Sequence, residues 1–396
     1  MSMVIQADLT KTLSAVAAAC DLVHLRLQNH SERTAYLALR IGVHLGLDKP
    51  RLKVLVLSAL LHDIGIISTK EKLELADFQP AHVAVTRHAQ RGYDLLMATR
   101  YLQSLALPVL QHHDYYRADL DIIPAILFVA DRAENLLRRD QYYLFQVDQV
   151  VERIRAYRET VFHPEVVDAL TDLAPTPSLW LDLQTGNYVK FIQDNPDMTH
   201  ELGLDELDDI AKLFATIVDS KSPFTATHSS GLAAKAAAMA TKLGMDQTKV
   251  RQMRIAALLH DIGKLAVPEE ILLSPGKLTP EEMAVMKQHT YHTYHLIGMI
   301  GKGVESIQRW AAFHHERLDG SGYPFGLSAD QLDSESRLLA ILDVFQALTE
   351  NRPYRPPLSL AETAAILRKE AAAGRLDQDL VELVLEHAEE LLDPAD

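Results

Sequence analysis

Cysteine and long apolar runs are scarce in this chain. Cys20 is the only cysteine, so no intramolecular disulfide can form, and we expect a reducing, cytoplasmic setting. No stretch approaches the ~18 apolar residues that span a bilayer. The opening MSMVIQADLT also lacks a basic start followed by an apolar core. We therefore expect neither a membrane span nor a signal peptide.

Positive charge is also in short supply. The 396 residues contain 39 Lys and Arg against 54 Asp and Glu, a net charge of −15. An acidic surface argues against a nucleic-acid polymer or an anionic membrane as partner. Binding to such a polyanion is favoured when basic residues displace its counterions, and an acidic surface cannot do this. A locally basic pocket for a small anionic ligand remains compatible with this balance. The length suggests two to three domains, and 48% apolar residues suffice for globular cores.

Almost every segment has a helical pattern, with apolar residues recurring at intervals of three and four. Thr279, Pro280 and Glu282 form a helix-start signal of N-cap, first-turn proline and capping-box glutamate. Prolines and a glycine interrupt the pattern over 175–191. We predict an all-α chain of two helical bundles, residues 1–172 and 201–396, joined by a connector over 173–200 with room for short strands.

One spacing of histidine and aspartate occurs twice, and ten of the 18 histidines take part in it. The first copy consists of His30, His62, Asp63, His88, His112, His113 and Asp131, and the second of His228, His260, Asp261, His289, His314, His315 and Asp343. The first His precedes the His-Asp pair by 32 residues in both copies, at 30 and 62 and at 228 and 260. Only the last interval differs much, with 18 residues from 113 to 131 and 28 from 315 to 343.

This repeat predicts a duplicated metal-binding domain. Imidazole and carboxylate groups are the ligands of iron, manganese, zinc and related ions, and one carboxylate can bridge two of them. Two neighbouring metals can activate water and stabilise both oxygens of a phosphoester displacement. A single histidine of this kind is often only a core residue. A set of seven that recurs in register within one chain favours a metal centre.

Two motifs of the second copy carry a family resemblance. The segment LLHDIGK (258–264), followed by HHERLDGSGYP (314–324), resembles the HD-GYP family, a branch of the HD phosphohydrolases. The resemblance covers roughly residues 208–385. It implies an all-α HD fold and a metal-dependent phosphodiesterase that opens a cyclic dinucleotide, cyclic di-GMP or 3′,3′-cyclic GMP-AMP. The product would be a linear dinucleotide, with further cleavage to mononucleotides left open.

The resemblance also implies a role for each matching residue. One metal would be held by His228, His260, Asp261 and Asp343, and a second, bridged by Asp261, by His289, His314 and His315. Asp261 and Lys264 would be the catalytic residues, with Lys264 on the scissile phosphate. Gly322, Tyr323 and Pro324 would shape the substrate mouth, and Arg352 and Arg355 would grip phosphate. Glu316 and Asp319 are expected to shape the loop rather than to bind metal.

Some family members bind a third metal through a glutamate four residues before the first histidine. That position is Phe224 here, which cannot coordinate a metal. We therefore expect two divalent transition metals, iron or manganese.

The first copy keeps all seven ligand types but lacks the groups that would handle phosphate. Ile66 stands where the second copy has Lys264, Asp140 stands where it has Arg352, and the GYP loop is absent. We expect a degenerate HD-like domain that does not cleave cyclic dinucleotides. Metal binding at this second candidate site, a regulatory or dimerising role, a different hydrolase activity and a structural remnant all stay open.

Two alternatives to the phosphodiesterase remain. A receptor could sense a cyclic dinucleotide or a metal and signal through a partner without turnover, but the intact ligand set and Lys264 favour the enzyme. An HD phosphohydrolase acting on nucleoside phosphates is disfavoured by the GYP loop. The expected partner is the cyclic dinucleotide substrate, and a homodimer is left open.

Overall fold

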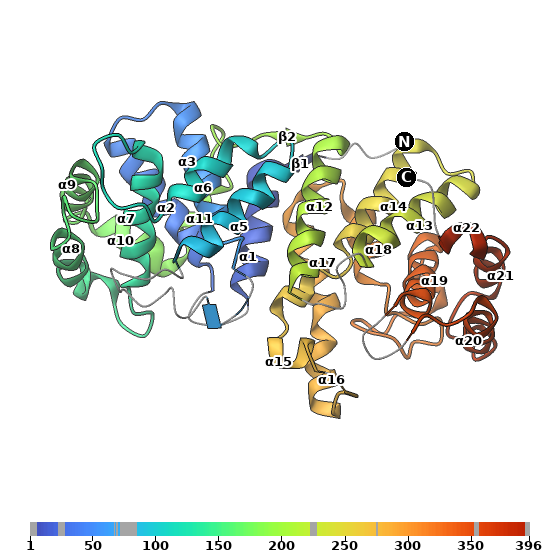
Figure 1. Ribbon diagram of the computed structural model, residues 1–396. Helices are drawn as coiled ribbons and strands as arrows, with labels where there is room; N and C mark the ends of the chain where they lie inside the picture. Colours follow the sequence, from blue (N-terminus) through green and yellow to red (C-terminus); the bar gives the residue numbers. More distant parts are fainter. Residues whose placement is uncertain are drawn as a thin grey trace. The chain divides into compact units, whose positions relative to one another are not determined.

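The structure is a computed structural model that describes residues 6–22, 28–66, 68, 70–71, 85–221, 228–274, 276–351 and 356–392. Its contacts divide the chain into two compact units. One is Asp8–Glu201, and the other is Leu202–Asp396 together with the residues up to Ala7. Both units are built from α-helices (Figure 1), which confirms the predicted all-α fold. No helix of the described residues is long and apolar enough to cross a membrane.

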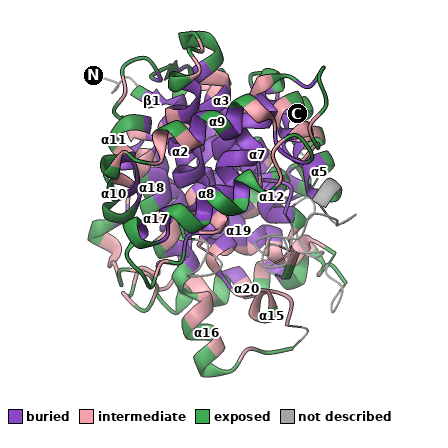
Figure 2. Cartoon of the chain, turned by 90° about the vertical axis from the view of Figure 1, so that its left-hand side faces the viewer, coloured by how far each residue is buried: buried purple, intermediate pink, exposed green. Residues whose placement is uncertain are grey.

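The first unit contains ten α-helices and two short 3-10 helices among its described residues. They are α1 (Leu9–Asp21), α2 (His30–His44), α3 (Lys49–Leu61), α5 (Val85–Ala98), η2 (Gln103–Leu105), α6 (Ala106–Gln111), α7 (Ile122–Asn135), η3 (Tyr143–Phe145), α8 (Val147–Arg155), α9 (Pro164–Leu173), α10 (Pro177–Thr185) and α11 (Tyr188–Ile192). Helix α2 packs against α3 and α7. The buried residues along α2 and α7, purple in Figure 2, form its core.

The second unit repeats this arrangement and adds helices at its C-terminal end. Its elements are α12 (Leu204–Ser220), α13 (His228–Lys242), α14 (Gln247–Leu259), η4 (Ile262–Ala266), α15 (Glu269–Leu272), α16 (Pro280–Met286), α17 (Gln288–Met299), α18 (Glu305–Ala312), η5 (Ala329–Gln331), α19 (Ser334–Thr349), α20 (Leu360–Ala372), α21 (Gln378–Glu386) and α22 (Ala388–Leu392). Helix α13 packs against α14 and α19, and η4 packs against α17.

The described residues include only three short strands, in the sheet order β2–β1–β3. These are β1 (Gln6–Asp8), β2 (Glu201–Leu202) and β3 (Gly301–Lys302). Strands β1 and β3 are antiparallel, with Gln6 opposite Lys302 and Ala7 opposite Gly301.

The predicted helix-start signal at Thr279 is present in the structure. The Thr279 hydroxyl accepts from the Glu282 amide at 3.2 Å, and the Glu282 carboxylate accepts from the Thr279 amide at 2.8 Å. This reciprocal cap satisfies two amides that have no partner within the helix.

The segment 173–200 differs locally from the expected connector. It forms α10 and α11 rather than extended pieces, and its contacts group it with the first unit. Pro177 occupies the first turn of α10, and Gly186, with φ of 81°, ends it in the left-handed conformation. Leu179, Trp180 and Leu183 recur at helical spacing and are fully buried. These prolines and this glycine mark the ends of helices instead of breaking one.

A close backbone approach fixes the segment after each His-Asp pair. A Cβ on Gly263 would lie 1.9 Å from the carbonyl oxygen of His289 and 2.8 Å from the amide nitrogen of Thr293. On Gly65, a Cβ would lie 2.1 Å from the carbonyl oxygen of His88. Glycine therefore lets both loops pack directly on the helix that carries the next histidine.

We predict that Gly263→Ala lowers the free energy of unfolding by about 1–3 kcal/mol, because the added methyl must push α17 away. The same displacement should weaken metal binding. Denaturant unfolding with metal analysis of the full chain checks both effects. Gly276→Ala is the matched control, since a Cβ there meets nothing within 4 Å. Equal stability of the two variants would contradict the proposed packing constraint.

Candidate metal centres

The seven candidate ligands of the second copy converge from five segments of the unit. His228 begins α13, His260 and Asp261 follow α14, His289 lies in α17, His314 and His315 follow α18, and Asp343 lies in α19. Six of them are buried, and His315 is partly exposed. They form two groups, His228 with His260 and Asp261, and His289 with His314 and His315. Within each group, one ligand atom from each residue lies within 4.8 Å of the others.

Asp261 lies between the two groups. Its Oδ2 is 3.1 Å from Nε2 of His260, and its Oδ1 is 3.5 Å from Nε2 of His289 and 3.9 Å from Nε2 of His314. Asp343 joins the first group through its Oδ1, which is 3.4 Å from Nε2 of His228. One carboxylate thus faces both groups, as a bridging ligand requires.

Backbone carbonyls set the orientation of three imidazole rings. The Nδ1 atoms of His260, His289 and His314 lie 2.7, 2.7 and 2.6 Å from the carbonyl oxygen three residues earlier. Each Nδ1–H can donate to that carbonyl, which leaves Nε2 as a lone-pair donor directed at the centre. This is the tautomer that binds metals through Nε2.

Burial keeps the second group neutral. It lowers the pKa of His289 to about 4 and that of His314 to about 3. Burial would raise the pKa of Asp261, but His260 and Lys264 outweigh it and hold that pKa well below its usual range. The second group therefore offers neutral nitrogens beside an ionised carboxylate oxygen, which is the protonation state that metals require.

The donor set fits a divalent cation. Oδ1 of Asp261 is buried and has no hydrogen-bond partner, although two imidazole nitrogens face it. Nε2 of His289 and Nε2 of His314 lie 3.5 Å apart, and the carbonyls occupy both Nδ1 atoms. Facing lone pairs and an unpaired buried carboxylate oxygen are costly unless a cation lies among them.

Lys264 and Tyr323 complete the surroundings of this centre. The ammonium of Lys264 forms an ion pair with Oδ2 of Asp261. The Tyr323 ring lies 4.9 Å from the ring of His315 and therefore covers the second group. Gly322 allows this approach, since a Cβ there would lie 2.4 Å from the Cα of Glu316. Pro324 follows in the same loop, which places the predicted mouth residues together.

Glu316 and Asp319 shape the loop. The Glu316 carboxylate accepts from the amides of Phe325 at 2.7 Å and Leu327 at 2.9 Å. Asp319 accepts from the Ser321 amide at 3.0 Å. Phe224, Arg352 and Arg355 lie outside the described residues.

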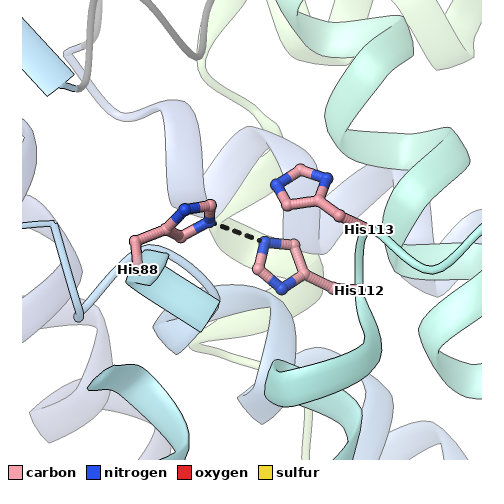
Figure 3. A group of neighbouring side chains, drawn as sticks. All are labelled: His88, His112 and His113. Carbon is pink, nitrogen blue, oxygen red and sulfur yellow. Dashed lines mark hydrogen bonds between the residues drawn. The ribbon is translucent and has the colours of Figure 1, made fainter. Parts of the chain in front are cut away.

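The first copy assembles its own seven candidates. His88, His112 and His113 converge as in Figure 3, with Nε2 of His88 3.2 Å from Nε2 of His112. His30, His62 and Asp63 form the other group. Asp131 joins it with Oδ1 3.2 Å from Nε2 of His30. Nδ1 of His62 and of His112 again face the carbonyl three residues earlier, at 2.7 and 2.5 Å.

The charges around the first copy differ. Ile66 is buried where the second copy has Lys264. The buried Arg132 instead places Nη2 3.0 Å from Oδ2 of Asp131. Phe128 covers His113 at a ring distance of 5.2 Å, in place of Tyr323 over His315. In the first copy the cation and the aromatic ring thus both come from α7, whereas in the second copy Lys264 lies in η4 and Tyr323 in a loop.

Sequence reasoning missed two kinds of supporting residue. Glu350 accepts from Nδ1 of His228 at 3.1 Å, and Glu134 accepts from Nδ1 of His30 at 2.5 Å. Glu350 and Glu134 follow the last aspartate of their copies at different sequence separations, so the repeated spacing could not identify them. A signal existed for Asp21 and Asp219, which precede the first histidine by the same interval.

These two aspartates bind the serine that follows each first histidine. Asp21 accepts from the Ser31 amide at 2.9 Å, and Asp219 accepts from the Ser229 hydroxyl at 3.0 Å. Both bonds hold the first turn of the helix that begins with the ligand.

The chain is similar to known proteins over almost its whole length. Residues 27–136 and 212–380 match HD domain family models. A Vibrio cholerae protein named 3′3′-cGAMP-specific phosphodiesterase 1 is 31% identical over 402 residues, covering 97% of this chain and 92% of the relative. The V. cholerae 3′3′-cGAMP-specific phosphodiesterase 3 is 25% identical, covering 91% and 90%. A Thermotoga maritima cyclic di-GMP phosphodiesterase is 38% identical over 157 residues, covering 39% and 42%.

A solved structure of a cyclic GMP-AMP specific phosphodiesterase from V. cholerae has the same fold, with a TM-score of 0.66 at 21% identity, covering 96% of this chain and 98% of that one. The fold and the His-Asp centres define a metal-dependent phosphodiesterase built from two HD domains. The chain belongs to the HD-GYP family.

We predict that Asp261→Ala lowers the metal content of the second centre more than any single histidine substitution there, because Asp261 faces both ligand groups. The measurement is elemental analysis after reconstitution with iron or manganese. A His62→Ala, Asp63→Ala background removes the contribution of the first copy. Asp379→Ala, an exposed carboxylate on α21, is the control. Full metal content in Asp261→Ala would rule out its bridging role.

Metal affinity should rise with pH. Burial lowers the pKa of His228, but Asp343 and Glu350 outweigh it and raise that pKa from 6.5 to about 9. Protonation of His228 stabilises the metal-free fold fully below pH 6.5, and this stabilisation disappears as the pH rises through about 9. A metal ion must displace this proton before it can bind. The metal affinity should therefore increase up to about pH 9, by roughly tenfold per pH unit for one exchanged proton. Calorimetric titration across pH tests this, and Glu350→Gln should move the rise to lower pH. A flat profile would contradict it.

Proposed function

We propose that the second copy hydrolyses a phosphodiester bond of a cyclic dinucleotide, with 3′,3′-cyclic GMP-AMP as its preferred substrate, and releases a linear dinucleotide. The observation that carries the proposal is the seven-ligand centre with Lys264 on Asp261 and Tyr323 over His315. Two relatives matched over at least 90% of both chains are named for 3′3′-cGAMP, which supports this preference. Cyclic di-GMP is the second candidate, since the T. maritima relative named for it is 38% identical over its shorter match.

Each described group has a distinct task in this proposal. The two metals, iron or manganese, would be held by the seven ligands, and when bound they supply Lewis acidity and activate water for attack. The ammonium of Lys264 neutralises charge that develops on the scissile phosphate, beside the carboxylate that spans both ligand groups. The Tyr323 ring shields the second group and offers a flat surface to a base. Arg352 and Arg355 remain proposed phosphate contacts.

The first copy is proposed to bind metal without hydrolysing the cyclic dinucleotide. Its ligands converge like those of the second copy, which supports metal binding. Its buried Arg132 is already paired with Asp131, and Asp140 forms an exposed ion pair with Arg138. Arg132 is buried, whereas Lys264 of the second copy is partly exposed, and the Asp140 carboxylate would repel a substrate phosphate rather than bind it.

Crossed substitutions in the full-length chain test the assignment. His260→Ala with Asp261→Ala should abolish turnover of 3′,3′-cyclic GMP-AMP, whereas His62→Ala with Asp63→Ala should leave a working second site. Lys264→Ala should keep its metal and lose ~10²–10³ in kcat, the size expected for one electrostatic group at the transition state. Product analysis by chromatography and elemental analysis provide the measurements.

Substantial turnover after loss of the second site would assign hydrolysis to the first copy. Tight binding of cyclic dinucleotide by the metal-loaded wild type without any turnover would instead favour a receptor.

A further inference from the structure

Lys287 is held in a fixed position next to the second ligand group. It lies between α16 and α17, two residues before the ligand His289. Its amide donates to the Met283 carbonyl at 3.0 Å, and its carbonyl accepts from the Thr290 hydroxyl at 3.2 Å. The preceding residue, Met286, supplies the carbonyl that orients the ring of His289. The same short segment therefore positions both the ligand and the lysine.

The side chain of Lys287 reaches the mouth of the centre. Its Nζ lies 5.3 Å from the centroid of the Tyr323 ring, and that ring covers His315. Lys287 is exposed, and within the described part of the chain it forms no ion pair. Lys264 differs, because its ammonium is paired with Asp261 inside the centre. Lys287 thus offers a cation that does not have to leave a carboxylate before it meets an anion.

Comparison with the first copy links Lys287 to phosphate handling. Thr86 occupies the corresponding position, two residues before His88. The other cations proposed to meet substrate are replaced as well: Lys264 by Ile66, Arg352 by Asp140 and Arg355 by Tyr143. The metal ligands survive in the first copy, whereas every one of these cations is missing. Between the two copies, Lys287 is therefore replaced together with the proposed phosphate-binding groups, whereas the metal ligands are kept.

We propose that Lys287 binds the phosphodiester of the cyclic dinucleotide that is not cleaved. This inference rests on the proposed function. A cyclic dinucleotide carries a second phosphodiester across its ring from the scissile one. With the scissile group at the metals and Lys264, the second group must be met outside the centre. Lys287 lies there, beside the Tyr323 ring that covers His315.

The test compares two substrates in the metal-loaded full-length chain. 3′,3′-Cyclic GMP-AMP has two phosphodiesters, and bis(4-nitrophenyl) phosphate has only one. Lys287→Ala should lower the ratio of kcat/KM for the cyclic dinucleotide to kcat/KM for the small diester by on the order of tenfold, mainly through a higher KM. Lys287→Arg should restore most of that ratio. Lys302→Ala, an exposed lysine on β3, is the matched control and should leave the ratio unchanged.

An unchanged ratio in Lys287→Ala, with normal metal content, would overturn the inference and leave the proposed function intact. A ratio that falls equally in Lys287→Arg would also overturn it, because the charge would then be irrelevant. A wild-type chain that cleaves the small diester but no cyclic dinucleotide would overturn the proposed function and the inference with it.

Discussion

The metal centre depends on direct backbone packing between the loop after each His-Asp pair and the helix that carries the next histidine. At Gly263 and at Gly65 even one methyl group would overlap a carbonyl oxygen of that helix. In the second copy, Thr293 of α17 adds two hydrogen bonds across the contact, accepting from the Gly263 amide and donating to the His260 carbonyl. Asp261 can face both ligand groups only because these two backbones touch. The ligand geometry thus depends on glycine, which has no Cβ, at these two positions.

The two copies keep this frame and change the charges around it. In the first copy the buried Arg33 pairs with Glu134, donates to the Tyr143 hydroxyl at 2.6 Å and donates to the Leu183 carbonyl at 3.1 Å. The second copy has Gly231 and Gln346 at the positions of Arg33 and Glu134. A charged network therefore ties η3 and α10 of the first unit to the helix that begins with His30. A buried, hydrogen-bonded charged network of this kind holds these elements rigidly together.

Much of the fold and most of the candidate ligands could be predicted from the sequence, because both rest on local or repeated patterns. Helical periodicity predicted the bundles, and the capping box at Thr279 lies within four residues. The repeat predicted which histidines converge, since a duplicated frame must place corresponding residues alike. Segment 173–200 was harder, because Pro177 and Gly186 are compatible both with a loop and with the ends of a helix. Glu350 and Glu134 escaped detection because Glu134 lies within α7 whereas Glu350 follows the end of α19, at a different distance from the last aspartate.

The contrast between the copies separates metal binding from substrate choice. Ligands for a metal must direct nitrogen and oxygen lone pairs at one point from fixed positions, and both copies bring such groups together with the same residue types. Binding an anionic diester on a chain of net charge −15 requires the opposite, namely cations near the surface of the centre. Lys264 and Lys287 provide these in the second copy, and Ile66 and Thr86 take their places in the first. Because metal binding and phosphate binding depend on different residues, a duplicated domain can lose the residues that bind phosphate while it keeps its metal ligands.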